Sequence, residues 1–474
     1  MKQTKILITY GPACQTQEQL RGLIRAGANA IRYNFSHGNP DDYQKFVKMV
    51  RELSEQEKVT VAILADLQGP KIRCGVLPDE GVMLKTGDSV LLGETAGSKD
   101  VQWIPVSQEL LKAVEPGHRI LFNDGRIEAE AKQVSPSGIM IEIKYGGMLH
   151  SRKGINFPDS RLAIESLTPQ DRIHAEAAIK HGVDYIALSF VRSAEDIKTL
   201  RELIKKHSTE NIPIIAKIEK PEAVHNLREI LGESEGVMVA RGDLGVETSP
   251  EAVPILQKNI IAQANHAGRL VITATQMLES MINSSKPTRA EATDVANAIL
   301  DGTDVVMLSG ETAQGEFPQE AVSMMSNIIK EAESFQGLHK NDPDKTFQGS
   351  EDFTSSICRA AVSCAENLDL SGIVVFTQSG ATALYTSKFH SMVPVIAFTP
   401  NIHVCRRCAL YRGVYPFIME AIKDTDKLFG LVDNMMKQWN MAEPGDQIAV
   451  IFGSPIRQMG YTNTLKLHAI GEGK

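Results

Sequence analysis

Short apolar runs rich in β-branched residues alternate with helical stretches along most of the chain up to residue 340. Such alternation is typical of parallel sheets, in which each helix carries the chain back to the start of the next strand. Eight strands, each followed by a helix, are predicted at Lys5–Tyr10, Ala30–Tyr33, Val59–Ala65, Asp184–Leu188, Ile212–Ile218, Gly236–Val239, Leu270–Ala274 and Asp304–Leu308. Because eight such units close into a barrel of about 250 residues, the pattern predicts an α/β fold of the (β/α)8 type.

The alternation stops after Pro70 and resumes at Leu167. In between, consecutive strands are separated by turn signals, and the strand period of two is clear in His118–Phe122, Glu128–Gln133 and Gly138–Tyr145. We therefore predict a small all-β domain, residues 70–160, inserted into a barrel formed by residues 1–69 and 161–340.

A polar stretch from Gln336 to Glu351 then breaks the barrel pattern and is predicted to be a linker. Beyond it a separate α/β unit, residues 345–474, is predicted. Its expected strands are Gly372–Thr377, Val395–Phe398, Val414–Ile418, Gln447–Phe452 and Thr464–Ile470. Together with the barrel and its insertion, this makes about three domains, in line with the chain length of 474 residues.

Charge and hydropathy exclude several classes of partner. The net charge is −8 at pH 7 and no strongly basic stretch is present, so a nucleic-acid partner is not expected. No apolar run reaches about 18 residues, so no membrane span is expected. Met1 to Tyr10 has no apolar core followed by a small-residue cleavage site, so no secretory signal is expected. We therefore expect a cytoplasmic protein.

The cysteines do not form a recognisable metal or disulfide framework. There are six of them in the whole chain, and Cys405 and Cys408 make a single CxxC. A structural zinc site needs four ligands, and no second cysteine pair follows. Because Val404 to Tyr411 has helical spacing, we predict ordinary helix positions for both cysteines.

The segments that follow the predicted barrel strands carry the chemistry. In a (β/α)8 barrel, reactive residues gather at the C-terminal ends of the strands. In chain order these ends hold Thr9, Arg32 to Gly38, Asp66, Ser189, Lys217 to Glu219, Arg241 to Asp243, Thr275 and Ser309 to Glu311. Nearly every end carries an ionisable or hydroxylic side chain, so we predict an active site at this rim.

The rim combines two carboxylates with several cations. Glu219 and Asp243 follow adjacent strands and suit Mg²⁺ or Mn²⁺, with water and substrate oxygens completing the coordination. The alternative is an ordinary salt-bridge network in which Lys217 and Arg241 pair with these carboxylates. Arg32, Arg73 and Lys217 would place three cations at the same mouth, which beside a divalent metal indicates a substrate with several phosphate oxygens.

At this point the residues resemble one family, the pyruvate kinases, and within it the bacterial, K⁺-independent subgroup. The matching segments lie in the expected order over the barrel and its insertion. They are Thr4–Ala13, Arg32–Gly38, Gly69–Arg73, Lys153–Asn156, Lys217–Glu219, Met238–Gly245, Ala274–Met281 and Leu308–Thr312, with Gly460–Asn463 in the C-terminal unit. Tyr10 and Tyr33 stand where the family more often has aliphatic residues.

The resemblance implies transfer of the phosphoryl group of phosphoenolpyruvate to ADP, which gives pyruvate and ATP in the last step of glycolysis. It implies that Lys217 stabilises the phosphoryl group in flight and that Arg32 contacts it. Glu219 and Asp243 would bind the divalent ion. The backbone amides of Gly242 and Asp243 would hold the substrate carboxylate.

Further roles follow from the same resemblance. The hydroxyl of Thr275 would also hold the carboxylate, and Thr275 and Ser309 could relay a proton to the enolate through water. Arg73, with Asn34 and His37 nearby, would face the nucleotide phosphates. The inserted domain would act as a lid that closes over the nucleotide and excludes water.

A monovalent-cation pocket is implied at Asn34, Ser36, Asp66 and the carbonyl of Leu67. Members that require K⁺ carry glutamate at the position of Lys71, whereas K⁺-independent members carry lysine there. A lysine ammonium can supply the charge that the ion would otherwise bring. We therefore expect that K⁺ is not required; the alternative is that Lys71 faces solvent at the lid hinge while K⁺ still binds.

The C-terminal unit offers a candidate effector loop. Thr377, Ser379, Gly380 and Thr382 follow an apolar strand and lead into a helix, where hydroxyls and amides suit a phosphate group. A plain helix cap is an equally good interpretation. Because Gln378 is uncharged, we expect a sugar monophosphate or AMP rather than a bisphosphate. The resemblance also implies a homotetramer.

Two other function classes stay open at this stage. A metal-dependent lyase could use the same rim to stabilise a pyruvate enolate, but it has no need of Lys217 or Arg73 aimed at a nucleotide, or of a lid. A catalytically inactive metabolite-binding regulator would be expected to have lost motif residues, and none is lost here. Pyruvate formation from phosphoenolpyruvate and ADP separates the three hypotheses.

Overall fold

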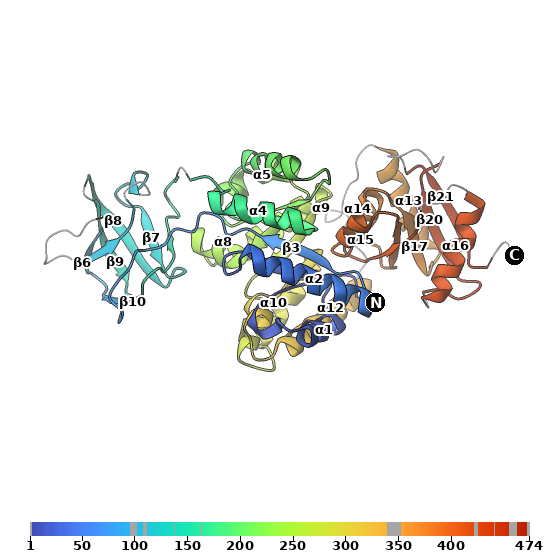
Figure 1. Ribbon diagram of the computed structural model, residues 1–474, viewed down its shortest axis with the longest axis horizontal. Helices are drawn as coiled ribbons and strands as arrows, with labels where there is room; N and C mark the ends of the chain where they lie inside the picture. The colour runs from blue at the N-terminus through green and yellow to red at the C-terminus, as the bar shows by residue number, and fades with distance from the viewer. Residues whose placement is uncertain are drawn as a thin grey trace.

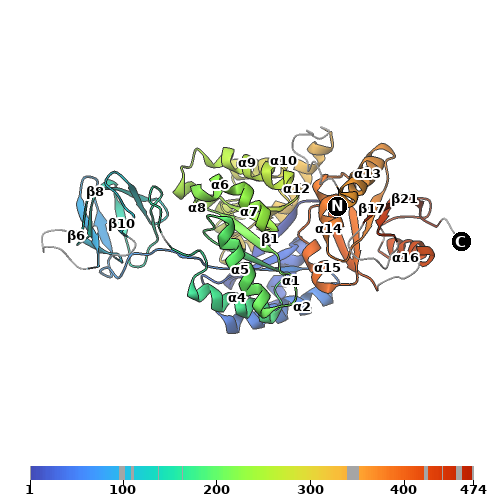
Figure 2. The same cartoon turned by 90° about the horizontal axis from the view of Figure 1, so that it is seen from above.

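Three bodies follow one another along the longest axis of the molecule. The structure is a computed structural model that describes residues 2–94, 102–107, 111–136, 138–162, 164–338, 352–420, 425–439, 441–454 and 462–471. The inserted β domain lies at one end, the barrel in the middle and the C-terminal domain at the other end (Figure 1). The view from above shows the same order (Figure 2).

The central body is a closed barrel of eight parallel strands in the order β1-β16-β15-β14-β13-β12-β3-β2. The strands are β1 (Lys5–Thr9), β2 (Ala30–Asn34), β3 (Ala62–Asp66), β12 (Tyr185–Leu188), β13 (Ile214–Ile218), β14 (Gly236–Ala240), β15 (Leu270–Ala274) and β16 (Val305–Met307). The predicted (β/α)8 barrel is therefore confirmed. Strands that follow one another in the chain are neighbours in the barrel. This includes β3 and β12, which pair directly although the inserted domain separates them in the sequence.

Helices cover the outside of the barrel and share a core with the outward-facing strand residues. They are α1 (Gln17–Ala26), α2 (Pro40–Glu57), α4 (Pro169–His181), α5 (Ala194–His207), α6 (Pro221–His225), α7 (Leu227–Glu233), α8 (Arg241–Glu247), α9 (Val253–His266), α10 (Arg289–Leu300), α11 (Gly310–Ala313) and α12 (Pro318–Leu338). Local signals start and stop them: Thr16 forms a capping box before α1, and Gly27 ends that helix with a φ of 119°.

The inserted domain is all-β, as predicted, and has a core of its own. Its strands are β4 (Val82–Leu84), β5 (Ser89–Gly93), β6 (Gln102–Pro105), β7 (Arg119–Phe122), β8 (Ile127–Ser135), β9 (Gly138–Tyr145), β10 (Gly147–Leu149) and β11 (Ile155–Asn156). Six form one sheet in the order β11-β7-β8-β9-β5-β6, and β10 pairs with β4. The two connecting arms meet each other in a bridge between Arg73 and Gly154.

The C-terminal domain is an α/β unit whose sheet has the order β19-β18-β17-β20-β21, with β21 antiparallel to β20. Its elements are α13 (Phe353–Asn367), β17 (Gly372–Phe376), α14 (Ala381–Lys388), β18 (Val395–Thr399), α15 (Ile402–Cys408), β19 (Val414–Ile418), α16 (Thr425–Gln438), β20 (Gln447–Phe452) and β21 (Thr464–Ala469). Residues 336–338, predicted to be linker, still belong to α12, and the rest of that stretch up to Glu351 lies outside the described residues, as do Gly460 and Tyr461.

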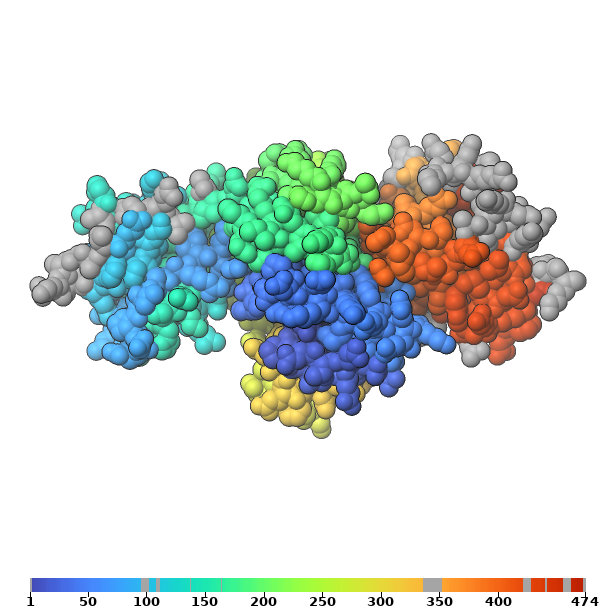
Figure 3. All heavy atoms as spheres, in the orientation of Figure 1, coloured from blue at the N-terminus to red at the C-terminus, as the bar shows by residue number. Residues whose placement is uncertain are grey.

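The C-terminal domain packs on the N-terminal ends of the barrel strands, and its residues lie directly against those of the barrel in Figure 3. Lys388, the last residue of α14, forms a fully buried ion pair with Asp304, just before β16. The Lys388 ammonium also donates to Asn265 Oδ1 at 2.8 Å. Tyr185, at the start of β12, donates its hydroxyl to the Arg407 carbonyl at 2.8 Å. The rim residues predicted from the sequence lie at the opposite, C-terminal end of the barrel strands.

Two further predictions concern single elements. Cys405 and Cys408 both lie on α15 and are buried, and burial raises the pKa of the Cys405 thiol above its ordinary value. This is the helical placement that their spacing predicts. None of the helices in the described part of the chain is both long and apolar enough to cross a membrane.

Candidate active site

The barrel rim brings Arg32, Asp66 and Lys217 into one charged group, the Lys217 group. Arg32 lies on β2, Asp66 ends β3 and Lys217 lies on β13. Arg32 Nε lies 2.6 Å from Asp66 Oδ2, and Lys217 Nζ lies 3.4 Å from Asp66 Oδ1. Lys217 Nζ is also 2.9 Å from Glu219 Oε1. Asp66 therefore pairs with both Arg32 and Lys217, the side chains predicted to contact the phosphoryl group. The sequence predicts a role for Asp66 only in the monovalent-cation pocket.

The charges in this group stabilise one another although the group is buried. Burial opposes the charged form of Lys217, but Asp66 and Glu219 outweigh it and hold its pKa above the ordinary value. Burial likewise opposes the carboxylate of Asp66, whose pKa is nevertheless lowered by Lys217 and Arg32. Lys217 is therefore a fully charged ammonium at neutral pH, with 12% of its side chain exposed at the mouth.

Ser189, at the end of β12, fixes the direction of the Lys217 side chain. The ammonium donates to Ser189 Oγ at 2.8 Å, and the Ser189 hydroxyl donates to the Leu67 carbonyl at 2.6 Å. The Leu67 carbonyl, predicted to be a cation ligand, thus already accepts a hydrogen bond. Ser189 follows its strand as the other rim residues do, so its position was visible in the sequence although no role was predicted for it.

Glu219 and Asp243 suit a divalent metal. Glu219 lies just past β13 with 1% of its side chain exposed, and its Oε2 accepts the Phe190 N–H at 2.6 Å. Asp243 lies in the first turn of α8. Burial raises the pKa of Glu219 despite Lys217, and the charge of Asp243 raises it further. A bound divalent cation would relieve the repulsion between these two carboxylates, so the donor set fits Mg²⁺ or Mn²⁺.

The alternative salt-bridge network is present only in part. Lys217 does pair with Glu219. Arg241, however, pairs with Asp294 at 2.6 Å and donates to the Thr275 carbonyl at 2.7 Å. Arg241 therefore contacts Asp294 and the Thr275 segment and does not pair with Glu219 or Asp243.

Thr275 has a strained backbone beside the N-terminus of α8. Its φ is 66°, which is unfavourable for a β-branched residue, and that of Gln276 is 53°. The Gly242 N–H donates to Thr275 Oγ1 at 2.8 Å, and the Thr275 hydroxyl donates to the Ala274 carbonyl at 2.6 Å. The structure thus brings together the hydroxyl and the amide predicted to hold a carboxylate. Such strain is typical of positions held for function.

Ser309 follows β16 and carries a buried hydroxyl without a hydrogen-bond partner among the described residues. Its backbone N–H donates to Glu311 Oε2 at 2.7 Å, and Glu311 also accepts the Leu278 N–H at 3.1 Å. The Glu311 carboxylate therefore orders the turn and leaves the Ser309 hydroxyl available to another group.

The predicted nucleotide residues are separated into two places. Asn34 Oδ1 accepts the Ser36 N–H at 3.0 Å, and His37 is exposed just after them. Arg73 lies on the first arm of the inserted domain, where its guanidinium donates to the Arg152 carbonyl at 3.1 Å. In the described part of the chain, Arg73 thus contacts the second arm and not the Lys217 group.

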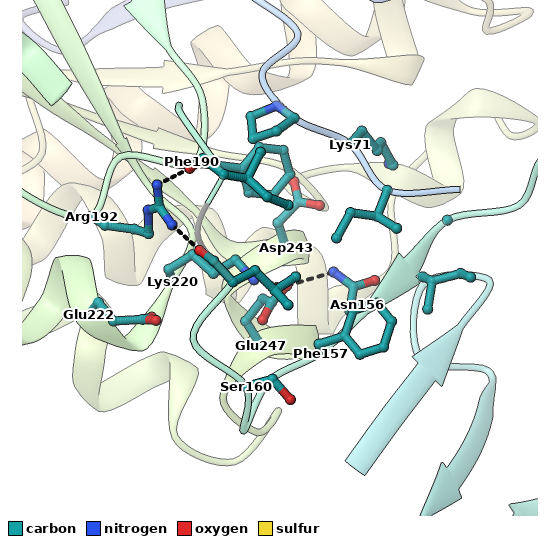
Figure 4. A pocket seen from close by; sticks show the side chains of 16 residues that line it. Lys71, Asn156, Phe157, Ser160, Phe190, Arg192, Lys220, Glu222, Asp243 and Glu247 are labelled. Atoms are coloured by element: carbon teal, nitrogen blue, oxygen red, sulfur yellow. Dashed lines mark hydrogen bonds and ion pairs between the residues drawn. The ribbon is translucent and has the colours of Figure 1, made fainter. Parts of the chain in front are cut away.

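Lys71 lies on the same arm and lines a pocket between the arms and the barrel mouth (Figure 4). Its ammonium is 3.9 Å from Asp124 Oδ1 of the inserted domain. The barrel contributes Phe190, Arg192, Lys220, Glu222, Asp243 and Glu247, and the arms contribute Pro70–Ile72, Gly154–Phe157, Ser160, Leu162 and Ile164. Of these, Lys220, Glu247 and Asn156 carry no role in the sequence predictions.

The candidate effector loop is closed by its own hydrogen bonds. Thr377 Oγ1 accepts the Gly380 N–H at 2.9 Å, and Ser379 Oγ accepts the Ala381 N–H at 3.4 Å. Thr382 lies within 2.7 Å of the Thr462 hydroxyl and is buried. Of the hydroxyls named for this loop, that of Ser379 belongs to an exposed residue.

Comparisons with known proteins place the whole chain in one family. A family model described as "Pyruvate kinase, barrel domain" matches residues 1–322, and one described as "Pyruvate kinase, alpha/beta domain" matches residues 355–468. The pyruvate kinase of Staphylococcus saprophyticus is 41% identical over 475 residues, which cover 100% of this chain and 81% of the relative. That of Clostridium perfringens is 40% identical over 479 residues, covering 99% of this chain and 100% of the relative.

A solved structure agrees with these matches. The crystal structure of a pyruvate kinase from Cryptosporidium parvum aligns with a TM-score of 0.92 at 34% identity, covering 99% of this chain and 96% of that one. The match thus includes the barrel, the inserted domain and the C-terminal domain. The chain belongs to the pyruvate kinase family.

Proposed function

We propose that the Lys217 group at the barrel mouth is where this enzyme moves the phosphoryl group of phosphoenolpyruvate to ADP, giving pyruvate and ATP. The observation that carries this proposal is the Lys217 ammonium, held charged by Asp66 and Glu219 and aimed by Ser189. Phosphoryl transfer needs positioning and charge stabilisation more than covalent help. A preorganised ammonium meets that need without reorganisation during the reaction.

Glu219 and Asp243 would hold the divalent ion on which the family depends, Mg²⁺ or Mn²⁺. When bound, the ion supplies a compact positive charge for the enolate and phosphoryl oxygens. Arg32, fixed by Asp66, would contact the phosphoryl group. Lys217, which pairs with both Asp66 and Glu219, would neutralise charge as the phosphoryl group moves.

Thr275 and the backbone amides of Gly242 and Asp243 bind the substrate carboxylate in this proposal. The Gly242 N–H now donates to Thr275 Oγ1, so substrate binding would exchange that bond for one to the carboxylate. The enolate then takes a proton through water from Thr275 or Ser309. The Ser309 hydroxyl, which has no hydrogen-bond partner within the described part of the chain, supports the second route.

The nucleotide would bind between the barrel and the inserted domain. We assign residues 1–69 and 161–340 to the catalytic barrel, 70–160 to the lid and 345–474 to the C-terminal domain. Arg73 would move with the lid toward the ADP phosphates, which meet Asn34 and His37 on the barrel. Closure would also exclude water from the transferring group.

A coupled assay of pyruvate formation tests the function directly. The enzyme is expected to form pyruvate from phosphoenolpyruvate only when ADP and a divalent ion are both present. Pyruvate formed without ADP would mean that the phosphoryl group goes to water, and no pyruvate under any condition would leave the lyase and inactive-regulator hypotheses. Either result would contradict the proposal.

Asp66→Asn is expected to lower turnover by about 10²-fold, because it releases the two side chains that Asp66 aligns. It should also change the pH profile. The charge of Asp66 raises the pKa of Lys217, so its loss lowers that pKa and moves the alkaline fall of activity to lower pH. The measurement is turnover against pH, with Asp301→Asn, whose carboxylate pairs with Lys258, as the matched control. An unchanged alkaline limb would contradict this role.

We propose that the enzyme does not require K⁺. Lys71, at the lid hinge, would bring its ammonium toward the Asn34, Ser36 and Asp66 side when the lid closes. Near-full activity is expected in buffers whose only monovalent cation is tetramethylammonium, and Lys71→Glu should create a K⁺ requirement. Lys71→Met is the control for loss of charge alone. If the wild-type enzyme gains about tenfold or more on adding K⁺, Lys71 does not replace the ion.

We propose that the loop of Thr377, Ser379, Gly380 and Thr382 binds a sugar monophosphate or AMP. The exposed Ser379 and the start of α14 support this proposal. Activity should rise with one of these compounds, and Ser379→Asp should abolish the response by placing a like charge against the phosphate. If sugar monophosphates and AMP leave activity unchanged, the loop is only a helix cap.

We also propose a homotetramer and a cytoplasmic location, both expected from the family. Sedimentation velocity tests the first of these. A monomer at assay concentration would contradict it.

A further inference from the structure

One buried carboxylate, that of Glu247, joins three separate segments at the lid hinge. Its Oε1 accepts from the Lys220 ammonium at 2.7 Å and from Asn156 Nδ2 at 2.7 Å. The Glu247 side chain is 1% exposed. Figure 4 shows Asn156 and Glu247 directed toward each other in the pocket between the arms and the barrel.

Two of these segments carry the proposed metal ligands. Glu247 ends α8, one helical turn after Asp243, so the two side chains lie on the same face of that helix. Lys220 directly follows Glu219 in the chain. The Lys220–Glu247 ion pair therefore ties the segment of one metal carboxylate to the helix of the other.

The third segment belongs to the lid. Asn156 lies on β11, which pairs with β7 of the large lid sheet through Asn156 and Leu121. The side chain of Asn156 therefore moves with the lid, while its partner Glu247 belongs to the barrel. Arg192 anchors the next part of the same arm by donating to the Leu162 carbonyl at 2.6 Å and to the Ile164 carbonyl.

Stability alone does not explain why these segments are joined by a buried charged cluster. A buried ion pair contributes little net stability, because both charges lose their hydration. The second oxygen of Glu247, Oε2, is buried without a hydrogen-bond partner among the described residues. An apolar contact would hold these segments at lower cost, which favours a role in setting geometry.

We propose that Glu247 is a positioning residue: through Lys220 it sets the separation of Glu219 and Asp243, and through Asn156 it couples that part of the site to the lid. The inference rests on the proposed function, because it takes Glu219 and Asp243 as the metal ligands. In many metal sites, residues behind the ligands orient those ligands and so adjust the affinity for the metal. Here the same carboxylate also contacts the element that closes over the nucleotide.

A simpler hypothesis is that Lys220 and Glu247 act only through their charge. The two hypotheses differ for Lys220→Met and for the double variant in Mn²⁺ binding to the full-length enzyme, measured by electron paramagnetic resonance without substrates. Charge alone predicts that Lys220→Met tightens Mn²⁺ binding, that Glu247→Gln weakens it, and that Lys220→Met/Glu247→Leu restores it. Positioning predicts that all three variants bind Mn²⁺ about tenfold more weakly. The double variant should then be no worse than the weaker single one, since the two side chains act as a unit.

Two controls keep this result interpretable. Arg51→Met removes a buried ion pair with Asp184 at the other end of the barrel and should leave Mn²⁺ affinity unchanged. Asp243→Asn tests the metal assignment itself and should abolish tight Mn²⁺ binding. If Asp243→Asn binds normally, the proposed ligand set is wrong. If it fails to bind while Lys220→Met or the double variant binds as the wild type does, the positioning inference alone is overturned.

The lid arm of the cluster has a separate readout. Asn156→Leu keeps the size of the side chain but removes the donor to Glu247. Mn²⁺ affinity without nucleotide should stay within about twofold, while the KM for ADP rises about tenfold and that for phosphoenolpyruvate does not. An unchanged KM for ADP would overturn the coupling to the lid.

Discussion

Lys217→Ala is expected to lower turnover by about 10³-fold or more while the KM for phosphoenolpyruvate changes little. In the proposed role the ammonium stabilises negative charge that develops as the phosphoryl group leaves, so its loss would raise the barrier more than it weakens substrate binding. Asp66 and Ser189 hold the ammonium in place before the substrate arrives. The measurement is a steady-state assay at saturating phosphoenolpyruvate, ADP and Mg²⁺.

The comparison for this variant is Lys258→Ala, which removes a lysine and its ion pair with Asp301 away from the Lys217 group. It should keep turnover within about twofold of the wild-type value. Thermal unfolding of both variants checks that the fold is intact. A large rise in KM with unchanged turnover in Lys217→Ala would show that Lys217 binds the ground state and does not act on the transition state.

Lys388→Met is expected to destabilise the protein by about 3–5 kcal/mol, the usual cost of leaving one partner of a buried ion pair alone. Lys388 and Asp304 are both fully buried where the C-terminal domain meets the barrel. Without the ammonium, Asp304 keeps the Val271 N–H as a donor but loses its counter-charge. Asn265 Oδ1 also loses the donor at 2.8 Å.

Urea unfolding should be followed by a probe local to the C-terminal domain, because a multidomain chain does not unfold in two states. The sequence has two tryptophans, and in a Trp103→Phe background the signal comes from Trp439, which stacks on Phe417. Adding Asp304→Asn to Lys388→Met should recover part of the loss by removing the unpaired charge. Lys258→Met, which breaks an ion pair whose lysine is half exposed, should cost less than about 1 kcal/mol. Equal midpoints for Lys388→Met and Lys258→Met would contradict the prediction.

Most of the secondary structure followed from local patterns. The strand Leu270–Ala274 was predicted with the bounds that the structure has, because it is a short apolar run between a turn at Gly268 and polar residues. The strand predicted at Val59–Ala65 begins at Ala62 instead. Lys58 ends α2 in a left-handed conformation, and the Val59 N–H donates to the Ser54 carbonyl. The β-branched Val59, which was predicted to begin the strand, therefore belongs to the end of the helix.

The site could be located by position but not assembled from the sequence. Arg32, Lys217 and Glu219 were named because they follow predicted strands, and the structure brings them together at one rim. The partners were not visible. Asp66 was expected in a cation pocket, yet it pairs with both Arg32 and Lys217. Glu247 gave no signal, since its spacing from Asp243 is that of any helix face.

The amino-acid sequence by itself determined the element order, the barrel class and the set of residues at the rim. These depend on apolar periodicity, turn residues and capping side chains, which act between neighbours in the chain. Only the tertiary structure decided which rim charges pair, that Leu67 and Thr275 already hold hydrogen bonds, and that the inserted domain contacts Glu247. Barrel closure brings together side chains that are far apart in sequence, and burial then makes each pairing strong. No local pattern encodes that distance.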